Sequence, residues 1–516
     1  MTISTSELIA LGLYFALMVA IGLYAYRKST SDMSDYMLGG RRLHPAVGAL
    51  SAGASDMSGW MLMGLPGAIF VAGFSAAWIA VGLVIGAYLN YRYVAPRLRL
   101  YTELADDSIT IPDFFENRFN DTSHALRSLS AVVIIIFFTL YTSAGIVAGG
   151  KLFEASFGID YTLGLFITSG VVLAYTVIGG FLAVSLTDFV QGCIMFLALI
   201  IVPVVAFLAI GGLSGAETSV AEAAPVLLAD GEVGPDRASF FSWTEGMTAL
   251  GLISLLSWGL GYFGQPHIIV RFMAIRSLKD MATARRIGMS WMIVTVIGAI
   301  LVGYVGVAYV SQNGLEAELS DPETIFILLS ESLFHPFASG LLLAAILAAI
   351  MSTISSQLLV SSSSLTEDLY KTFLRKTASQ SELVLVGRLS TVAVCLVAIA
   401  LAFDRSSNIL SLVSNAWAGF GAAFGPIILL SLFWRGLTRD GALAGMLVGA
   451  ATVLIWLYAP ITLNGASLSS TLYEIVPGFV MGLTAAVLVS WLGRAVKPRV
   501  AKGFDEMSEQ MADATS

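Results

Sequence analysis

A carboxylate lies in the middle of a long apolar segment near the start of the chain. The stretch SAGASDMSGW, residues 51–60, places Asp56 among serines and glycines, with apolar sequence on both sides. An ionised residue at the centre of a lipid bilayer is costly, so such residues usually face a pathway or a partner. We therefore expect Asp56 to line a pathway, and capping of a broken half-helix is the structural alternative.

A second polar group interrupts the apolar stretch AAILAAIMSTISSQ, residues 344–357. Ser352, Ser355 and Ser356 are spaced i, i+3 and i+4 and share one helix face, and Thr353 adds another hydroxyl. A helix that unwinds inside a membrane leaves carbonyls that need partners, and oxygen ligands suit a small hard cation. The two stretches together indicate a cation site. The alternative is that these hydroxyls only bond their own or a neighbouring helix.

Glycines and a proline loosen another apolar segment. The stretch SWGLGYFGQPH, residues 257–267, contains Pro266. Four aromatic residues lie in or near the two loosened stretches or in FFTLYTSAGIVAGG, namely Trp60, Tyr141, Trp258 and Tyr262. Aromatic faces beside the amide end of a broken helix suit a solute with an apolar body and a carboxylate. Ordinary packing of the rings is the alternative.

Two further charged residues are candidates for a role beside these sites. Asp188, in AVSLTDFVQ, lies near the inner end of an apolar segment, where it would line an exit path or merely stabilise a helix start. Arg41, in GGRRLHP, lies just before the segment that holds Asp56. For Arg41 the alternative is that its charge only fixes the orientation of the chain in the membrane.

The composition identifies the elements that must position these residues. Of the 516 residues, 57% are hydrophobic and 12% are charged, against about a quarter charged in soluble domains. The chain is therefore an all-α integral membrane protein, and it has no basic patch for nucleic acid. A membrane span needs roughly 20 mostly apolar residues. Thirteen segments qualify: 8–26, 45–66, 75–96, 127–154, 161–178, 183–211, 246–270, 286–311, 336–363, 384–403, 408–434, 441–459 and 474–494.

The positive charges predict the orientation of these spans. Cytoplasmic loops carry an excess of Lys and Arg. With the N-terminus outside, only Lys151, Arg237 and Arg405 of the 27 Lys and Arg residues fall outside, and the others, Arg271 among them, fall at cytoplasmic loops or helix ends. This arrangement puts the C-terminus in the cytoplasm. The polar end, 500–516, is expected to be disordered.

The two loosened stretches lie at the same depth. At 1.5 Å per residue, Asp56 is roughly 17 Å into the second span and Trp258 roughly 18 Å into the seventh, near the middle of a ~30 Å core. The second and seventh spans are five spans apart, so each can begin a unit of five helices. Because five is odd, the second unit crosses the membrane in the opposite direction to the first, which predicts an inverted repeat. The resulting division is 1–44 (first helix and cytoplasmic loop), 45–211 (first repeat, helices 2–6), 212–245 (external loop), 246–434 (second repeat, helices 7–11), 435–494 (peripheral helices 12 and 13) and 495–516 (cytoplasmic tail).

From about residue 5 to 495 the sequence closely resembles the sodium:solute symporter family. The stretches that carry the likeness include LGGRRLHPAVGALSAGASDMSGWMLMGLPGA, SWGLGYFGQPHIIVRFMA, ILAAIMSTISSQLLVSSSSLTEDLYK and AWAGFGAAFGP. The resemblance implies thirteen transmembrane helices with a LeuT-type, five-plus-five inverted-repeat core and peripheral helices. It also implies a bacterial inner-membrane transporter.

The resemblance further implies specific site residues. The Na⁺ ligands would be the carbonyls of Ala54, Met57 and Ala349 and the hydroxyls of Ser352 and Thr353. The pocket for L-proline would be formed or bordered by Ser58, Gly59, Trp60, Tyr141, Trp258, Tyr262 and Pro266. Asp56 would couple Na⁺ to transport, and Asp188 and Arg41 match positions linked to transport. Ser355 and Ser356 leave a second Na⁺ site open.

The function expected from these observations is Na⁺-coupled symport of L-proline by alternating access, with Na⁺ as the co-transported ion. Three alternatives stay open: the same machine with another solute, a channel, and a membrane enzyme. An enzyme is disfavoured because the sequence has no His-rich metal motif and no nucleophile–base pair. The sequence does not fix the oligomeric state.

Overall fold

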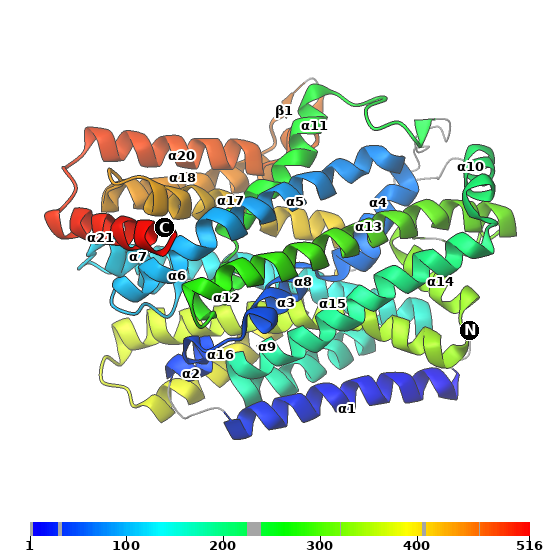
Figure 1. Cartoon of the computed structure of the whole chain (residues 1–516), viewed down its shortest axis with the longest axis horizontal. Helices are drawn as coiled ribbons and strands as arrows, with labels where there is room; N and C mark the ends of the chain where they lie inside the picture. The colour runs from blue at the N-terminus through cyan, green and yellow to red at the C-terminus, as the bar shows by residue number, and fades with distance from the viewer. Residues whose placement is uncertain are drawn as a thin grey trace.

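The computed structural model describes residues 4–28, 33–223, 239–319, 321–404, 409–463 and 465–515. Most of these residues form helices that run along the long axis of the molecule (Figure 1). The first half comprises α1 (Thr5–Lys28), α2 (Met33–Leu38), α3 (Pro45–Asp56), α4 (Leu65–Ala72), α5 (Trp78–Leu89), α6 (Ala95–Leu104), α7 (Ile111–Phe119), α8 (Ala125–Phe157), α9 (Tyr161–Ala209) and α10 (Gly212–Glu222).

The second half continues with α11 (Ala249–Leu256), α12 (Pro266–Ala274), α13 (Met281–Asn313), α14 (Ile325–Leu333), α15 (Pro336–Ser363), α16 (Gln380–Leu401), α17 (Ile409–Phe433), α18 (Arg439–Tyr458), the short hairpin β1 (Thr462–Leu463) and β2 (Ala466–Ser467), α19 (Leu468–Thr471), α20 (Ile475–Leu492) and α21 (Pro498–Thr515). Within the described residues, ten helical stretches are long and apolar enough to cross a membrane.

The expected spans map onto these helices unevenly. The fifth and sixth both fall on α9, which turns sharply at Gly180, where φ is +57°. The second and seventh fall on interrupted helices whose pieces are too short to cross a membrane individually. Large apolar side chains on the outer face are exposed, such as Leu197 (55%) and Leu396 (57%), as expected for a surface in contact with lipid acyl chains.

The segment that holds Asp56 is interrupted at the residue that follows it. His44 caps α3 by accepting a hydrogen bond from the Ala46 amide at 3.3 Å, and Pro45 suits the first helical position. The helix ends at Asp56 because Met57 leaves the helical conformation, with φ −84° and ψ 76°. A π-helical turn, residues 60–64, then leads into α4.

The second interruption lies between α11 and α12. A 3₁₀ segment, residues 257–264, follows α11, and Gln265 is extended before Pro266 starts α12. The beginning of α3 and the end of α12 are joined by backbone hydrogen bonds, because the Leu43 amide donates to the Ala274 carbonyl at 3.1 Å and the Arg276 amide donates to the Leu43 carbonyl at 3.2 Å. The two interrupted helices therefore pack side by side, and α3 also packs against α9, α13 and α15.

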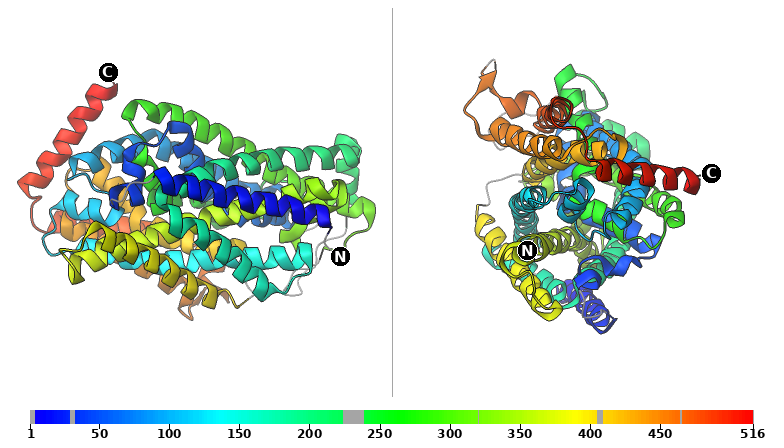
Figure 2. Two further views of the ribbon diagram at one scale, coloured as in Figure 1. Left: turned by 90° about the horizontal axis from the view of Figure 1, so that it is seen from below. Right: turned by 90° about the vertical axis from the view of Figure 1, so that its left-hand side faces the viewer.

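Two polar segments are more ordered than composition alone indicates. The prediction of disorder for 500–516 is wrong, because α21 is a helix that crosses the end of the bundle (Figure 2). Its residues Val500, Met507 and Met511 are buried, and α21 packs on α6 and α7. Loop 212–245 begins with α10, and its residues 224–238 lie outside the described part of the chain, as do Arg237 and Arg405.

Candidate ion and solute site

Four of the five expected cation ligands meet where α3 breaks beside α15. The Ser352 hydroxyl donates to the Ala54 carbonyl at 2.7 Å and to the Ala349 carbonyl at 3.1 Å. The Thr353 hydroxyl donates to the same Ala349 carbonyl at 3.2 Å. All four residues are buried, as is Met57, whose carbonyl is turned away from the helix direction by its non-helical ψ. We call these five residues the oxygen cluster.

The oxygen cluster offers only neutral oxygen atoms. Carbonyl and hydroxyl oxygens are ligands for hard cations, and strong divalent sites add carboxylates to such a set. The described residues contain no group of three or more His, Cys, Asp or Glu side chains able to hold a metal ion. A bound cation would take over the lone pairs that now accept hydrogen bonds from Ser352 and Thr353. The donor set therefore fits a monovalent hard cation such as Na⁺.

Asp56 links the two interrupted helices. Its side-chain Oδ2 accepts a short hydrogen bond from the Tyr262 hydroxyl, and its carbonyl accepts one from the Trp60 indole at 3.2 Å. The other carboxylate oxygen, Oδ1, is buried and has no hydrogen-bond partner among the described residues. A cavity of about 20 Å³ borders this carboxylate and is also lined by Asn90 and Tyr91. Asp56 directly precedes Met57 of the oxygen cluster in the chain, while its carboxylate faces Tyr262 at the second interruption.

The structure brings the four expected aromatic residues, Trp60, Tyr141, Trp258 and Tyr262, together around the break in α3. The Trp60 and Trp258 rings lie 6.4 Å apart between centroids, and Tyr262 reaches Asp56, the fourth residue before Trp60. Ser58 and Gly59 occupy the break itself. Tyr141 packs edge-on against His267 at 6.0 Å, and its buried hydroxyl lies beside the Ser58 side chain at the break. These groups offer aromatic faces and polar side chains to a small solute.

Two aromatic residues that the sequence did not single out join this group. Tyr473 stacks on Trp258 with 5.4 Å between ring centroids, and Trp417 packs edge-on against Tyr262 at 5.2 Å. The Trp417 indole also donates to the Trp258 carbonyl at 2.8 Å, which fixes the loosened 3₁₀ segment. Only the stretch AWAGFG around Trp417 gave a signal in the sequence, through the family resemblance.

Pro266 and Arg41 lie apart from the Asp56 carboxylate. Pro266 lines a separate cavity of about 20 Å³ with Phe181 and Val270. Arg41 sits at the end of the molecule where α3 begins, where it pairs with Asp107 at 2.8 Å and donates to the Met273 carbonyl at 2.9 Å. Arg41 thus ties the chain before α3 to the end of α12, and its role in transport stays a prediction.

Asp188 forms an ion pair with Arg271, a residue that the distribution of Lys and Arg wrongly predicts to lie in water at a cytoplasmic helix end. Counting positive charges puts Arg271 at a cytoplasmic helix end, but the structure buries its side chain completely, 3.3 Å from the Asp188 carboxylate, which is also fully buried. Because Arg271 lies on the inward face of the short helix α12, its charge meets Asp188 of α9 instead of water. The Arg271 guanidinium also donates to the His267 carbonyl at 2.6 Å.

Two serines connect this pair to the oxygen cluster. The Ser51 hydroxyl donates to Asp188 at 2.7 Å, and Ser356 contacts both members of the pair. Ser51 is three residues before Ala54 on α3, and Ser356 is three residues after Thr353 on α15, so each lies about one helical turn from the cluster. The pair therefore lies next to the oxygen cluster, on the side toward the beginning of α3.

Comparison with known proteins gives consistent results. Residues 36–449 match the sodium:solute symporter family. The osmoregulated proline transporter OpuE of Bacillus subtilis is 56% identical over 489 residues, which cover 95% of each chain. The high-affinity proline transporter PutP of the same organism is 57% identical over 495 residues, covering 96% of this chain and 100% of the relative. A sodium/proline symporter of Staphylococcus aureus is 52% identical over 487 residues, covering 94% and 92%.

Two solved structures share the fold. A Na⁺-coupled sialic acid symporter in a substrate-bound, outward-open state superposes with a TM-score of 0.76 at 20% identity, covering 96% of this chain and 99% of that one. Mhp1, a nucleobase-cation-symport-1 family transporter in a closed conformation with bromovinylhydantoin bound, gives a TM-score of 0.51 at 11% identity, covering 91% and 98%.

Proposed function

Because this chain belongs to the sodium:solute symporter family, we propose that it carries L-proline into the cell together with Na⁺. The chain is a multi-pass membrane transporter and not an enzyme. The observation that carries the proposal is the convergence of Ala54, Ala349, Ser352 and Thr353 at the break in α3. The identity of 52–57% with proline transporters supports L-proline as the solute.

The proposed architecture has thirteen crossings in a bacterial inner membrane. Helices 2–6 and 7–11 form the two inverted repeats, within 45–211 and 246–434, and helices 1, 12 and 13 are peripheral. The occurrence of one interrupted helix in each half, at Met57 and at Gln265, supports the repeat. The distribution of Lys and Arg supports an external N-terminus and a cytoplasmic C-terminus.

In the proposed mechanism Na⁺ is a substrate that binds first. The oxygen cluster supplies the carbonyls of Ala54, Met57 and Ala349 and two hydroxyls, so the ion fixes the break in α3 against α15. This orders the backbone from Ser58 to Trp60, whose amides suit a carboxylate. The aromatic rings then enclose the apolar ring of proline. Closure on the outside and opening on the inside release both substrates.

The energetics of this cycle favour accumulation. Proline is a zwitterion, so one Na⁺ per cycle carries one net charge, worth about 2.3 kcal/mol at 100 mV. A tenfold Na⁺ gradient adds about 1.4 kcal/mol. The total, about 3.7 kcal/mol, sustains a several-hundredfold proline gradient.

The experiment that tests the function measures uptake of radiolabelled proline into proteoliposomes with and without an imposed Na⁺ gradient. We expect accumulation above the external concentration only with the gradient. Equilibration without accumulation would identify a channel, and recovery of a chemically altered product would identify an enzyme. Absence of proline uptake, together with Na⁺-driven accumulation of another labelled solute, would assign a different substrate to the same transporter.

Replacing Ser352 and Thr353 together by Ala is expected to weaken Na⁺ binding. The double variant loses two of the five proposed ligands. Losing one or two interactions of about 1.5 kcal/mol each lowers affinity by about 10- to 100-fold. The Na⁺ concentration for half-maximal uptake should therefore rise by the same factor. The measurement is the Na⁺ dependence of proline uptake. A loss of proline affinity at saturating Na⁺, without a change in Na⁺ dependence, would contradict the assignment.

A matched control lies further along the same helix. The Ser362 and Ser363 hydroxyls both donate to the Leu359 carbonyl, at 2.9 and 2.8 Å, just as Ser352 and Thr353 share the Ala349 carbonyl. Replacing this second pair by Ala should leave the Na⁺ dependence unchanged, since it removes the same kind of hydrogen bond away from the break.

A further inference from the structure

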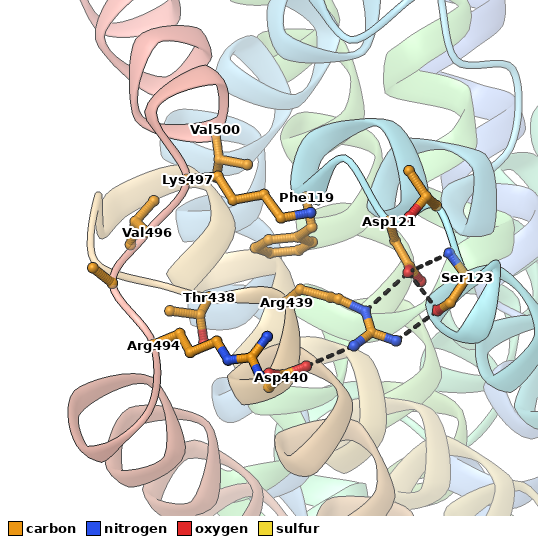
Figure 3. Close-up of a pocket in the computed structure, with 12 residues that line it drawn as sticks. Phe119, Asp121, Ser123, Thr438, Arg439, Asp440, Arg494, Val496, Lys497 and Val500 are labelled. Carbon is orange, nitrogen blue, oxygen red and sulfur yellow. Dashed lines mark hydrogen bonds and ion pairs between the residues drawn. The ribbon is translucent and has the colours of Figure 1, made fainter.

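A polar cavity lies at the end of the molecule where the chain passes from α20 to α21. It has a volume of about 250 Å³ and is lined by Phe119, Arg439, Arg494, Val496 and Lys497, among others (Figure 3). Arg439 belongs to the start of α18, Arg494 and Lys497 belong to the α20–α21 connection, and Phe119 ends α7. We call this space the basic cavity.

The carboxylates of the basic cavity are already engaged by one arginine. Arg439 pairs with Asp121 at 2.9 Å and with Asp440 at 2.7 Å, and it donates to the Ser123 hydroxyl at 2.6 Å. Asp121 also accepts the Leu126 amide at 2.9 Å. The negative charge in the cavity is thus used within the protein, as the dashed lines in Figure 3 show.

The other two cations, Arg494 and Lys497, have no anionic partner within the described part of the chain. Arg494 makes no ion pair or hydrogen bond with any described residue, and Lys497 donates only to the Asn120 carbonyl, at 3.0 Å. Both side chains are exposed at the rim of the cavity. The lining carries three positive and two negative side chains, a net charge of +1. This net charge, with two cations that lack a direct ion pair among the described residues, suits an anionic group such as a phosphate, which accepts hydrogen bonds from guanidinium and ammonium groups.

The surroundings of the basic cavity point to a lipid. At the end of α20, Trp491 and Leu492 are 79% and 81% exposed, and they precede Arg494 by three and two residues. An exposed Trp at a helix end is typical of the membrane–water boundary, where its ring sits at headgroup level. An acyl chain lying on Trp491 and Leu492 would therefore place its phosphate next to Arg494 and Lys497.

We propose that the basic cavity binds the headgroup of an anionic phospholipid, with phosphate on Arg494 and Lys497 and acyl chains on the exposed end of α20. Free phosphate has the same headgroup chemistry but leaves the apolar surface uncovered. In the proposed orientation the site faces the inner leaflet, where anionic lipids attract basic residues near the membrane surface. The lipid would join α18, α20 and α21 at one point.

The test is native mass spectrometry of the detergent-solubilised full chain, titrated with phosphatidylglycerol or phosphatidylcholine without Na⁺ or proline. We expect the first lipid to bind on the order of tenfold more tightly than the second. Replacing Arg494 and Lys497 by Gln should abolish this preference. Replacing Arg499 and Lys502 by Gln makes the same charge change on neighbouring α21 and should preserve it.

Three results would overturn the proposal. One is an unchanged preference after Arg494 and Lys497 are replaced. Another is an equal loss after Arg499 and Lys502 are replaced, which would indicate a general effect of surface charge. The third is displacement of phosphatidylglycerol by excess inorganic phosphate, which would identify a site for free anions. Because no substrate is present, failure of this proposal is distinct from failure of the proposed symport.

Discussion

Asp56→Asn is expected to raise the Na⁺ concentration for half-maximal proline uptake on the order of 100-fold, or to abolish uptake, while the protein stays in the membrane. For a cation bound about 6 Å from the carboxylate, at an effective dielectric constant of about 20, the attraction would be about 3 kcal/mol, which is about 100-fold in affinity. Asn has the same shape and its carbonyl still accepts from the Tyr262 hydroxyl, so the variant removes chiefly the charge. The measurement is the Na⁺ dependence of radiolabelled proline uptake, normalised to protein in the membrane fraction.

Two controls separate charge from structure in this experiment. Tyr262→Phe removes the hydrogen bond to Asp56 but keeps the carboxylate, so it should disturb Na⁺ dependence far less than Asp56→Asn. Asp280→Asn makes the same chemical change at a surface carboxylate paired with Arg276 and should have no effect. Normal Na⁺ dependence in Asp56→Asn would defeat the coupling role.

The second large effect is expected from splitting the Asp188–Arg271 pair. Removing one partner of a buried ion pair leaves an uncompensated charge and typically costs about 3–5 kcal/mol. Asp188→Asn and Arg271→Gln should therefore each lower the thermal unfolding temperature of the purified protein strongly. The double variant, which buries no charge at this position, should be destabilised by less than the sum of the singles.

Na⁺ gives this experiment a second readout. In Arg271→Gln the Asp188 carboxylate keeps the Ser51 and Ser356 hydroxyls but loses its cation. NaCl should thus raise the unfolding temperature of this variant more than that of the unmodified protein, relative to choline chloride. The exposed pair Arg435–Asp505 is the control, because Arg435→Gln should have a much smaller effect. Additive losses in the double variant would contradict the pairing argument.

The interruptions were predictable because their signals are local. A carboxylate, serines and glycines at the expected mid-membrane depth predict the break at Met57, and the glycines before Pro266 predict the one at Gln265. The spacing indicated a polar helix face with Ser352, Ser355 and Ser356, and the family resemblance selected Ser352 and Thr353 as the ligands. Their placement against Ala54 did not follow from the spacing, because residues nearly 300 positions apart meet only through the packing of α3 on α15; the family resemblance supplied that step.

The burial of Arg271 could not be predicted from the sequence, for a physical reason. Its position near the expected inner end of a span reads as a topology signal, since most such arginines remain in water. Its burial depends on α12 being a short helix packed against α3 and α6, from which the long Arg271 side chain reaches Asp188 of α9. A charged residue inside the otherwise apolar run PHIIVRFMA was the available sign.

For α21, amino-acid composition led to a wrong prediction of disorder. The stretch is polar enough to predict disorder, yet Val500, Phe504, Met507 and Met511 recur at helical spacing. Arg118, buried beneath this helix, lies over the Phe504 ring at 5.7 Å. The periodicity was therefore the better guide to α21 than the mean polarity.

The backbone bonds around Leu43 have a mechanical consequence. Leu43 is hydrogen-bonded through its backbone to both Ala274 and Arg276, and Arg41 donates a hydrogen bond to the Met273 carbonyl. These contacts couple α3 and α12, one piece of each interrupted helix, so that the two are expected to move as one rigid body. A conformational change that opens the ion site toward the cell interior must therefore either move α3 and α12 together or break these hydrogen bonds. A cross-link between the chain before α3 and the end of α12 should then leave transport intact. A cross-link from either segment to a helix that does not move with them should block transport.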